Sequence, residues 1–488
     1  MQFKVRQIVR ATGGRLLAGL RPGEGGLRPG EAGSAGAPAG RIVTDTRALA
    51  AGETFLALHG RRFDGHAFLE KAVRRGASCL VIDRPESLDA LGQTDARLAV
   101  VQVPDTLEAL GALARAARRR LKCPVVAITG SCGKTTLKEM VGQVLGRRLK
   151  GRLPPKSFNN LIGVPLTLLG AEEDDEFVLC EFGTNAPGEI GRLSAMAEPT
   201  IGVVTLVGSA HLEGLGSLEG VAAEKGALVE ALPPKGLAVL NADDPRVAAM
   251  AKRCRARVVT FGRCEGADLR AEDLIQTDRS IQFTAVAAGA KAGAGVGFAL
   301  PVPGEHQVLL ALASALVARE VGVPLEATAE ALRDFRPPPM RLAVEEAGGV
   351  LVVNDAYNAN PESMRAALRL LALWPDRRKV FFCGDMLELG AHSAAAHAAL
   401  GREIAEAGVR RLVCVGTETR ATARAAVEAG LAEGAVSTYA SADLASADAA
   451  KTVERGDVVL VKGSRAIGME CVVEAIAAAA APAGEPTR

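Results

Sequence analysis

Residues 128–136, with the sequence ITGSCGKTT, constrain the fold of this chain more than any other stretch. They follow an apolar run, residues 125–128, that is typical of a short buried strand, and they precede a segment with apolar residues at helical spacing. A strand, a glycine-containing loop and a helix in this order are the context that a phosphate-binding loop requires. The sequence therefore predicts an α/β nucleotide-binding domain around this loop.

Two glycines, a lysine and a threonine give the loop its chemistry. Gly130 and Gly133 have no Cβ, so backbone N–H groups at the helix start can approach phosphate oxygens closely. Lys134 can place its ammonium on the β- and γ-phosphates, and Thr135 can offer its hydroxyl to Mg²⁺. Where such loops usually have their first glycine this chain has Ile128, so the loop is a compact variant. The other nucleotide-binding candidates in the loop are Ser131, Cys132 and Thr136.

Composition limits the class of protein. A chain of 488 residues is long enough for about three domains of ~150 residues. A net charge of +2 and 3% aromatic residues argue against a nucleic-acid-binding surface, so no nucleic-acid partner is expected. The densest basic cluster, residues 118–122, is typical of a solvated helix end. The 9 scattered cysteines lack Cys-x-x-Cys spacing, which favours reduced thiols in a cytoplasmic protein. No apolar run reaches the ~20 residues of a membrane span.

The pattern along the chain predicts an α/β protein of three domains. Residues 1–110 alternate short β runs with helical ones and form a small α/β domain, with a Gly-, Pro- and Ala-rich insertion at 21–40. Residues 111–335 predict a central domain, a mostly parallel sheet with helices on both faces. Residues 337–339 are three prolines and mark a linker. Residues 336–488 repeat strand and helix and predict a Rossmann-like, doubly wound domain. Because they lack a Gly-x-Gly-x-x-Gly fingerprint, we do not expect NAD binding.

Short apolar runs predict the individual strands. The strands expected in the three domains are 54–58, 79–83 and 98–103; 177–181, 201–206, 238–241 and 258–261; and 350–354, 379–383, 412–415, 436–439 and 458–461. Residues 277–286 and 296–300 are typical of a hairpin added to the central domain, and residues 304–321 and 325–335 are typical of helices.

Two side chains of the central domain are candidates for a metal site. Glu181 ends one expected strand, and His211 lies in a glycine-rich loop after the next. Ligands of open α/β sheets bind at the carboxyl ends of strands. A lone glutamate is usually a surface charge and a lone histidine usually structural, but together beside a phosphate-binding loop they favour a magnesium site. Lys225 alone is an ordinary helix lysine.

The third domain has further polar groups at expected strand ends. Arg341 follows the proline linker, from which a guanidinium could reach a nucleotide. Residues 354–363, NDAYNANPES, end a strand and contain Asp355, Tyr357, Asn358 and Asn360. Residues 384–390, GDMLELG, end another strand. The loop at 354–363 contains more hydrogen-bonding side chains than a simple connection between a strand and a helix needs.

These motifs together resemble those of the Mur ligases, the ATP-dependent amide ligases of peptidoglycan precursor synthesis. The motifs are residues 44–47, 129–136, 159–165, 210–217, 241–244, Arg341, 357–361 and 384–390. The resemblance covers all three domains. The last two motifs are typical of the members that add D-alanyl-D-alanine to UDP-N-acetylmuramoyl-tripeptide through an acyl phosphate, so these two substrates are the implied partners.

The resemblance also implies roles for individual residues. Thr46 and Arg47 would contact the UDP end of the substrate. Lys134 would be catalytic, and Arg341 and Asp355 would close on the nucleotide from the third domain. The implied cofactors are ATP and two Mg²⁺ ions. The first ion would be held by Thr135. The second would be held by Glu181, His211 and Lys225, and Lys225 matches a lysine that is carbamylated in relatives. The loop that faces D-alanyl-D-alanine and supports closure would use Tyr357, Asn358 and Asn360.

Four positions depart from the family pattern. Cys132 stands where an asparagine is usual, Gln307 and Leu310 replace asparagines, and Ala227 replaces a glutamate. A helix N-terminus and Lys134 beside Cys132 predict a thiol pKa below the ~8.5 of a free cysteine. The alternative is an inert small residue whose burial raises that pKa.

Two other functions stay open from the residues alone. One is a Mur ligase that adds the third amino acid. The other is a nucleotide-dependent regulatory protein without ligase activity, against which the retained Lys134, Glu181, His211 and Lys225 argue. The tripeptide could end in diaminopimelate or in lysine. We expect a monomer.

Overall fold

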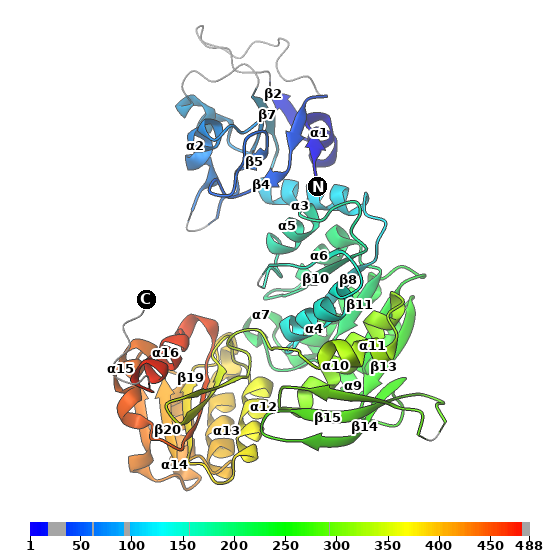
Figure 1. The fold of residues 1–488 in the computed structure, drawn as a ribbon. Helices are drawn as coiled ribbons and strands as arrows, with labels where there is room; N and C mark the ends of the chain where they lie inside the picture. Colours follow the sequence, from blue (N-terminus) through cyan, green and yellow to red (C-terminus); the bar gives the residue numbers. More distant parts are fainter. Residues whose placement is uncertain (18–35, 61–62, 92–97, 156, 292, 481–488) are drawn as a thin grey trace. The chain divides into compact units, whose positions relative to one another are not determined.

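The computed structural model describes residues 1–17, 36–60, 63–91, 98–155, 157–291 and 293–480 (Figure 1). The chain divides into two compact units. The first unit consists of Met1–Ala127, Leu149–Phe182 and Gly191–Thr200, and the second of Ile128–Arg148, Gly183–Ile190 and Ile201–Arg488. Both units are mixed α/β, as predicted. Residues 21–35 of the insertion expected at 21–40 lie outside the described residues.

A five-stranded sheet forms the amino-terminal part of the first unit. Its order is β2 (Arg15–Leu17), β7 (Ala99–Gln102), β6 (Cys79–Ile82), β5 (Thr54–Leu56) and β4 (Ile42–Val43). All neighbouring strands are parallel except β2 and β7. The helices α1 (Val5–Thr12) and α2 (Leu69–Arg74) accompany the sheet. The three strands predicted here are confirmed, each with shorter bounds.

The rest of the first unit contains the helices α3 (Thr106–Arg118) and α5 (Gly163–Leu169) and the parallel strands β9 (Gly151–Arg152) and β10 (Phe177–Glu181). It also contains α6 (Glu189–Ala197) from Gly191 onward, whereas the first two residues of α6 belong to the second unit. The basic cluster at the end of α3 agrees with the predicted solvated helix end at Arg119 and Lys122, which are exposed, but not at Arg118. Arg118 is buried, and its guanidinium donates to the carbonyl oxygens of Ala197, Glu198 and Leu121. These carbonyls fix the position of its guanidinium, so it does not lie on a solvated face.

In the second unit, parallel strands carry an antiparallel addition. Strand β8 (Val125–Thr129) crosses the division between the units, and β11 (Ile201–Val204), β12 (Leu237–Asn241), β13 (Arg257–Gly262) and β14 (Leu269–Gln276) follow in parallel. Strands β15 (Ile281–Ala287) and β16 (Val296–Leu300) then pair antiparallel. The expected strand at 277–286 starts too early, because Thr277 N–H donates to Ser280 O in a turn. Strand β14 was not predicted.

Six α-helices lie among the described residues of this part of the second unit. They are α4 (Lys134–Gly146), α7 (Leu212–Leu215), α8 (Leu218–Glu230), α9 (Pro245–Ala249), α10 (Glu305–Glu320) and α11 (Leu325–Leu332). The predicted helices at 304–321 and 325–335 are confirmed. Residues 333–342, all of which the structure describes, form neither a helix nor a strand between α11 and the next strand, in agreement with a proline linker.

The carboxyl-terminal part of the second unit is a six-stranded sheet. Its order is β17 (Ala343–Ala347), β18 (Val350–Asp355), β22 (Val458–Lys462), β19 (Lys379–Gly384), β20 (Arg411–Val415) and β21 (Val436–Tyr439). All pairs are parallel except β17 with β18. Five helices alternate with the strands, namely α12 (Pro361–Leu370), α13 (Ser393–Glu406), α14 (Thr419–Glu428), α15 (Ala442–Thr452) and α16 (Glu470–Ala480). The predicted doubly wound fold is confirmed.

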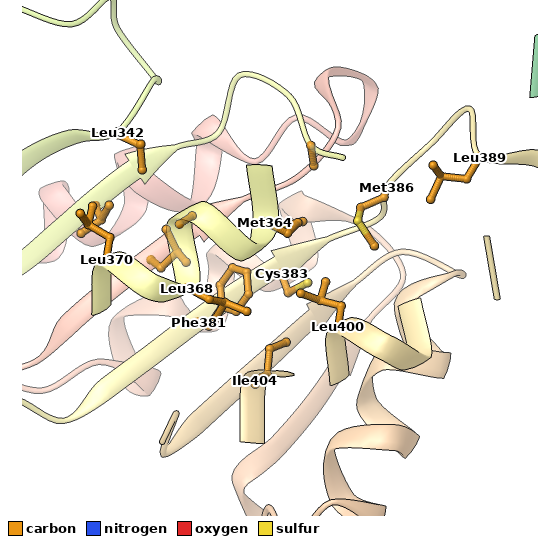
Figure 2. Close-up of a cluster of buried hydrophobic side chains, with 14 of the residues drawn as sticks. Leu342, Met364, Leu368, Leu370, Phe381, Cys383, Met386, Leu389, Leu400 and Ile404 are labelled. Carbon is orange, nitrogen blue, oxygen red and sulfur yellow. The ribbon is translucent and has the colours of Figure 1, made fainter. Parts of the chain in front are cut away.

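Both faces of this sheet are buried, which explains its apolar strands. Successive side chains of a strand point to opposite faces. Phe381 and Cys383 therefore pack on the side of α12, α13 and α14, while Val380 and Phe382 pack on the side of α15 and α16. Figure 2 shows Phe381 and Cys383 beside Met364 and Leu368 of α12 and beside Leu400 and Ile404 of α13. Burial of such side chains stabilises each by roughly 1.5–3 kcal/mol.

Among the described helices, none has both the length and the apolar character that crossing a membrane requires. All 9 cysteines are free thiols in the structure, as predicted from their spacing.

Candidate active site

The phosphate-binding loop joins β8 to α4, in the predicted order of strand, loop and helix. The helix begins at Lys134, directly after the loop. Two backbone hydrogen bonds tie the loop to the neighbouring strand end: Thr205 N–H donates to Thr129 O, and Ser131 N–H donates to Leu206 O. The hydroxyl of Ser131 bonds both the N–H and the C=O of Gly208. The loop is therefore held in one conformation from its strand to its helix.

The two loop glycines are required by space and by backbone conformation. Gly130 has φ 148° and Gly133 has φ 81°, in the range that favours glycine. A Cβ at Gly130 would lie 1.8 Å from Oγ1 of Thr205, and a Cβ at Gly133 would lie 2.9 Å from Cδ2 of Leu310. Leu310, one of the departures from the family pattern, thus packs against the loop. Gln307, another departure, is buried, and its Oε1 has no hydrogen-bond partner among the described residues.

Two lysines of the site influence each other electrostatically. Nζ of Lys134 donates to Gly130 O at 2.7 Å, within the loop itself. Lys225 is fully buried on α8, and burial, with a smaller effect of Lys134, lowers the pKa of its ammonium to about 7. Near neutral pH, an amine with this pKa is partly uncharged and can act as a nucleophile.

The neighbouring helix residue Glu224 organises the loop before α6 and the start of that helix. Its carboxylate is buried and accepts the N–H groups of Gly188 and Ile190, both at 2.7 Å, and the hydroxyl of Thr184 at 3.4 Å. The sequence offered no signal for this role, because a glutamate inside a helix is usually exposed.

The surroundings of the half-buried Cys132 disfavour the thiolate that its position in the loop predicted. Burial is the largest cause that raises the pKa of its thiol, although Lys134 and Lys462 act in the opposite direction. Its Sγ donates to Oδ1 of Asn360 at 3.1 Å, and Nδ2 of Asn360 donates to Ser131 O at 3.3 Å. The alternative interpretation, burial that raises the pKa, is therefore correct.

His211 is held by a carboxylate from the loop after β19. Its ring Nδ1 lies 2.5 Å from Oε2 of Glu388, and Glu213 N–H donates to Glu388 O at 3.0 Å. The hydrogen bond to His211 is the largest cause that lowers the pKa of Glu388. Nδ1 is therefore occupied, and Nε2 is the ring nitrogen that remains for a ligand.

Glu181 is described within the first unit. It ends β10, is buried, and accepts Nδ2 of Asn159 on Oε1 at 3.0 Å. Asn159 belongs to a motif singled out in the sequence. Among the described residues, no group of three or more histidine, cysteine, aspartate or glutamate side chains could hold a metal ion. A cation here would need further ligands, such as phosphates or a modified lysine.

The polar loop after β18 is fixed by a lysine that the sequence did not single out. Nζ of Lys462, at the end of β22, donates to Oδ2 of Asp355 at 2.5 Å and to Asn358 O at 2.8 Å. The other oxygen of Asp355 accepts Leu342 N–H at 3.2 Å. Burial raises the pKa of Asp355, and Lys462 opposes that effect. Both oxygens of Asp355 are thus engaged within this part of the unit.

The linker residue Arg341 stacks on Tyr357. Its guanidinium carbon lies 4.0 Å from the ring centroid, a cation–π geometry. The flanking residues Met340 and Leu342 have φ values of 60° and 54°, which are unfavourable for residues with side chains. Tyr357 N–H donates to Met340 O at 3.1 Å, so the linker is attached to the polar loop.

Asn358 and Asn360 have different partners. Oδ1 of Asn358 accepts Ala359 N–H at 2.9 Å. Oδ1 of Asn360 also accepts Ser363 N–H at 2.9 Å, which caps the first turn of α12.

In the first unit, Thr46 is buried and Arg47 is exposed. Arg47 pairs with Asp45 at 2.7 Å, and this hydrogen bond is the largest cause that lowers the pKa of Asp45 to about 2. Thr135 and Thr136 are buried in the first turn of α4.

Comparison with known proteins places this geometry in a family. The Mur ligase family, catalytic domain model matches residues 40–118, the Mur ligase middle domain matches 128–318, and the Mur ligase, glutamate ligase domain matches 340–465. A ligase of Mycobacterium bovis is 39% identical over 475 residues, which covers 90% of this chain and 92% of the relative. The chain belongs to the Mur ligase family. The resemblance inferred from the motifs is thereby confirmed.

The Mur ligase relatives share one name. The proteins of Mycobacterium bovis and Escherichia coli are both named UDP-N-acetylmuramoyl-tripeptide–D-alanyl-D-alanine ligase. The Escherichia coli Mur ligase is 36% identical and covers 89% of this chain and 93% of its own length.

Solved Mur ligase structures agree with the fold. A crystal structure of MurF from Acinetobacter baumannii superposes with a TM-score of 0.84 at 29% identity and covers 98% of this chain and 99% of its own. MurF from Thermotoga maritima, solved in complex with ADP, has a TM-score of 0.77 at 28% identity. The match covers 90% of this chain and 97% of the Thermotoga maritima chain.

Proposed function

We propose that this chain is an ATP-dependent amide ligase that joins D-alanyl-D-alanine to UDP-N-acetylmuramoyl-tripeptide in peptidoglycan precursor synthesis. The main support is a match along 90% of the chain to a relative of that name. The phosphate-binding loop, the buried Lys225 and the polar strand-end loops supply the groups that such chemistry needs.

The reaction converts a carboxylate into an amide. A carboxylate oxygen of the tripeptide attacks the γ-phosphorus of ATP, the bond to the ADP oxygen breaks, and an acyl phosphate forms. The amine nitrogen of D-alanyl-D-alanine then attacks the acyl carbon, the carbon–oxygen bond to phosphate breaks, and the amine loses a proton. Two unit like charges 4 Å apart repel by about 4 kcal/mol at an effective dielectric constant of 20. Lys134 would offset this repulsion at the γ-phosphate.

Mg²⁺ is part of the proposal. The hydroxyl of Thr135 would contact a first ion beside the phosphates, and Glu181, His211 and a carbamylated Lys225 would hold a second. Lys225 fits this role because carbamylation requires a neutral amine, and its pKa of about 7 makes a neutral amine available. The carbamate would add carboxylate-like oxygens, which hard cations prefer. Bound Mg²⁺ would neutralise charge on the transferring phosphoryl group.

Three domains divide the work in this proposal. Residues 1–110 would bind the UDP end of the substrate through Thr46 and Arg47, and residues 111–335 would bind ATP. Residues 336–488 would close on the nucleotide with Arg341 and Asp355, and would face the dipeptide with Tyr357, Asn358 and Asn360. Closure would shield the acyl phosphate from water. We further propose a cytoplasmic monomer.

Substrate-dependent phosphate release tests the function. The full chain is incubated with MgATP, and phosphate is measured with each substrate omitted in turn and with tripeptides ending in diaminopimelate or lysine. Release that needs both the UDP-tripeptide and D-alanyl-D-alanine is expected. Dependence on a shorter UDP-dipeptide and a single amino acid would instead indicate a ligase for the third residue. Release without either substrate would indicate a plain ATPase.

A further inference from the structure

The dipeptide substrate of the proposed reaction needs a binding partner for its terminal carboxylate. Its amine must lose a proton in the reaction, whereas its terminal carboxylate keeps its charge throughout. When the site closes, that carboxylate leaves bulk water and needs a cation or several hydrogen-bond donors. None of the residues proposed above to face the dipeptide is a cation.

Three cations lie around the loop after β18, and they are not equivalent. Lys462 is buried and engaged by Asp355 and Asn358. Arg341 is stacked on Tyr357 by the linker. Arg465 approaches the same ring, with its guanidinium carbon 5.9 Å from the centroid, and its side chain is 53% exposed. Two guanidinium groups beside one ring repel each other, and an anionic ligand would relieve this repulsion.

One side of the Arg465 guanidinium is already fixed. Nη1 donates to Oε1 of Glu470 at 2.8 Å, and Glu470 is the first residue of α16. Within the described residues, Nε and Nη2 of Arg465 make no hydrogen bond. These two nitrogens form the edge of the guanidinium that accepts a carboxylate with two parallel hydrogen bonds. Glu470 therefore orients the group and leaves that edge open.

The backbone around Arg465, in the loop after β22, is held by the loops that follow two other strands. Its N–H donates to Oδ1 of Asn358 at 3.4 Å, in the loop after β18. The preceding residue, Ser464, donates its N–H to Asp385 O and accepts Leu387 N–H on Oγ, both at 2.9 Å, in the loop after β19. A binding group supported in this way keeps its position without ligand.

Apolar surface accompanies this cation. Leu387, bonded through its backbone to Ser464, has 37% of its surface exposed, and it is one of few large apolar residues exposed in the described chain. Sδ of Met340 lies 4.0 Å from Nη1 of Arg465. The methyl groups of D-alanyl-D-alanine are small apolar groups that such surfaces can contact.

We infer that Arg465, oriented by Glu470, binds the terminal carboxylate of D-alanyl-D-alanine, with Tyr357 and Leu387 as apolar walls of the subsite. The inference rests on the proposed function. It explains how a ligase would select a dipeptide by length, since the amine and the anchored carboxylate must both reach their partners.

Kinetics with the dipeptide and its neutral C-terminal amide test the inference. The wild-type chain should use the amide with kcat/KM reduced by about 10- to 100-fold, the range of a charge-assisted pair. Arg465→Ala should lose a similar factor on the acid and should no longer distinguish acid from amide. Arg465→Lys should retain part of the preference for the acid over the amide. Lysine keeps the positive charge but cannot donate the two parallel hydrogen bonds of a guanidinium. Glu470→Gln should weaken the preference less than Arg465→Ala.

The controls separate this inference from the proposed function. Arg424→Ala removes an exposed arginine of α14 that pairs with Glu428, and it should leave both substrates unaffected. Unchanged KM values for ATP and UDP-tripeptide in Arg465→Ala would show that the variant is folded. Full acid-over-amide preference in Arg465→Ala, or a raised KM for ATP instead, would overturn the inference while the ligase function stands. If the wild-type chain needs no dipeptide for phosphate release, the proposed function itself fails.

Discussion

Nδ1 of His211 lies 2.5 Å from Oε2 of Glu388, and both residues have left-handed backbone conformations, with φ values of 59° and 63°. Such conformations are unfavourable for residues with side chains and persist where the surrounding structure imposes them. The carboxylate fixes the ring orientation and presents Nε2, so Glu388 acts as a positioning residue for His211.

We predict that Glu388→Gln lowers kcat by about 10- to 100-fold, as is typical when the partner of a ligand histidine is removed. Glu388→Gln combined with His211→Ala should be no worse than His211→Ala alone, since the two act as a unit. Glu213→Gln, an exposed carboxylate nearby, is the matched control. Multiplicative losses in the double variant would contradict the assignment.

Lys134→Ala should abolish phosphate release while binding of the UDP-substrate, measured by calorimetry, stays within about twofold. The reason is that Lys134 is proposed to be the loop cation for the transferring phosphate, whereas the UDP end is proposed to bind at Thr46 and Arg47. Lys138→Ala would be a poor control because Lys138 is buried; Lys122→Ala, outside the loop and exposed, is suitable. Near-normal turnover in Lys134→Ala would disprove the role.

Lys225 should make stability depend on pH. Its folded pKa of about 7 is below the 10.5 of an unperturbed lysine, so between these values the unfolded chain binds more protons than the folded chain. Stability contributed by this group therefore rises with pH across that window. From pH 7 to pH 9 the free energy of unfolding should rise by about 2 kcal/mol more in wild type than in Lys225→Met. Urea unfolding in CO₂-free buffer measures this free energy at each pH, and Lys235→Met is the exposed control. An equal change of the unfolding free energy with pH in wild type and in Lys225→Met would refute the prediction.

Gly133→Ala should destabilise the loop by about 1–3 kcal/mol, since a new Cβ meets Leu310 and the φ of 81° disfavours alanine. Adding Leu310→Ala removes the contact but not the backbone strain, so it should relieve only part of the ATP-binding defect. The measurements are thermal unfolding and nucleotide titration. Complete rescue of nucleotide binding would mean that backbone conformation is unimportant at Gly133.

Cys132 should be alkylated more slowly than the exposed Cys264 near pH 8, because burial raises its thiol pKa and its Sγ is bonded to Asn360. Cys264 is exposed and should be labelled first. Asn360→Ala removes the partner and should accelerate labelling of Cys132 but not of Cys264. Mass-spectrometric mapping with a limiting reagent measures both rates, and fastest labelling at Cys132 in wild type would contradict the structure.

Strands with continuous apolar runs were predictable, and strands rich in charged residues were not. The bounds of β10 and β21 agree with the prediction at both ends. Strand β17 contains Glu345 and Glu346, and β14 contains Arg270, Glu272 and Asp273, so neither has an apolar run. Such strands are specified by the neighbour with which they pair, which is a tertiary property.

The site shows the same division between local and tertiary information. Loop geometry at Gly130 and Gly133 follows from local residue types, and it was predictable. The contacts of Lys462 and Glu388 join segments more than a hundred residues apart, and no local pattern indicates them. The difference at Cys132 has the same cause, since a helix N-terminus is visible in the sequence, whereas the burial of the thiol and its contact with Asn360 are not.

The pair of Asp355 and Lys462 also has a consequence for folding. The two residues are opposite each other in the parallel register of β18 and β22, at the last pair of that ladder. The apolar residues before them could tolerate a shifted pairing, because both faces of these strands are buried. A shift by one residue would separate the two charges and leave each buried without its partner, at a cost of several kcal/mol. This ion pair therefore selects one alignment of the central strands, and its loss should allow misaligned sheets to accumulate during refolding.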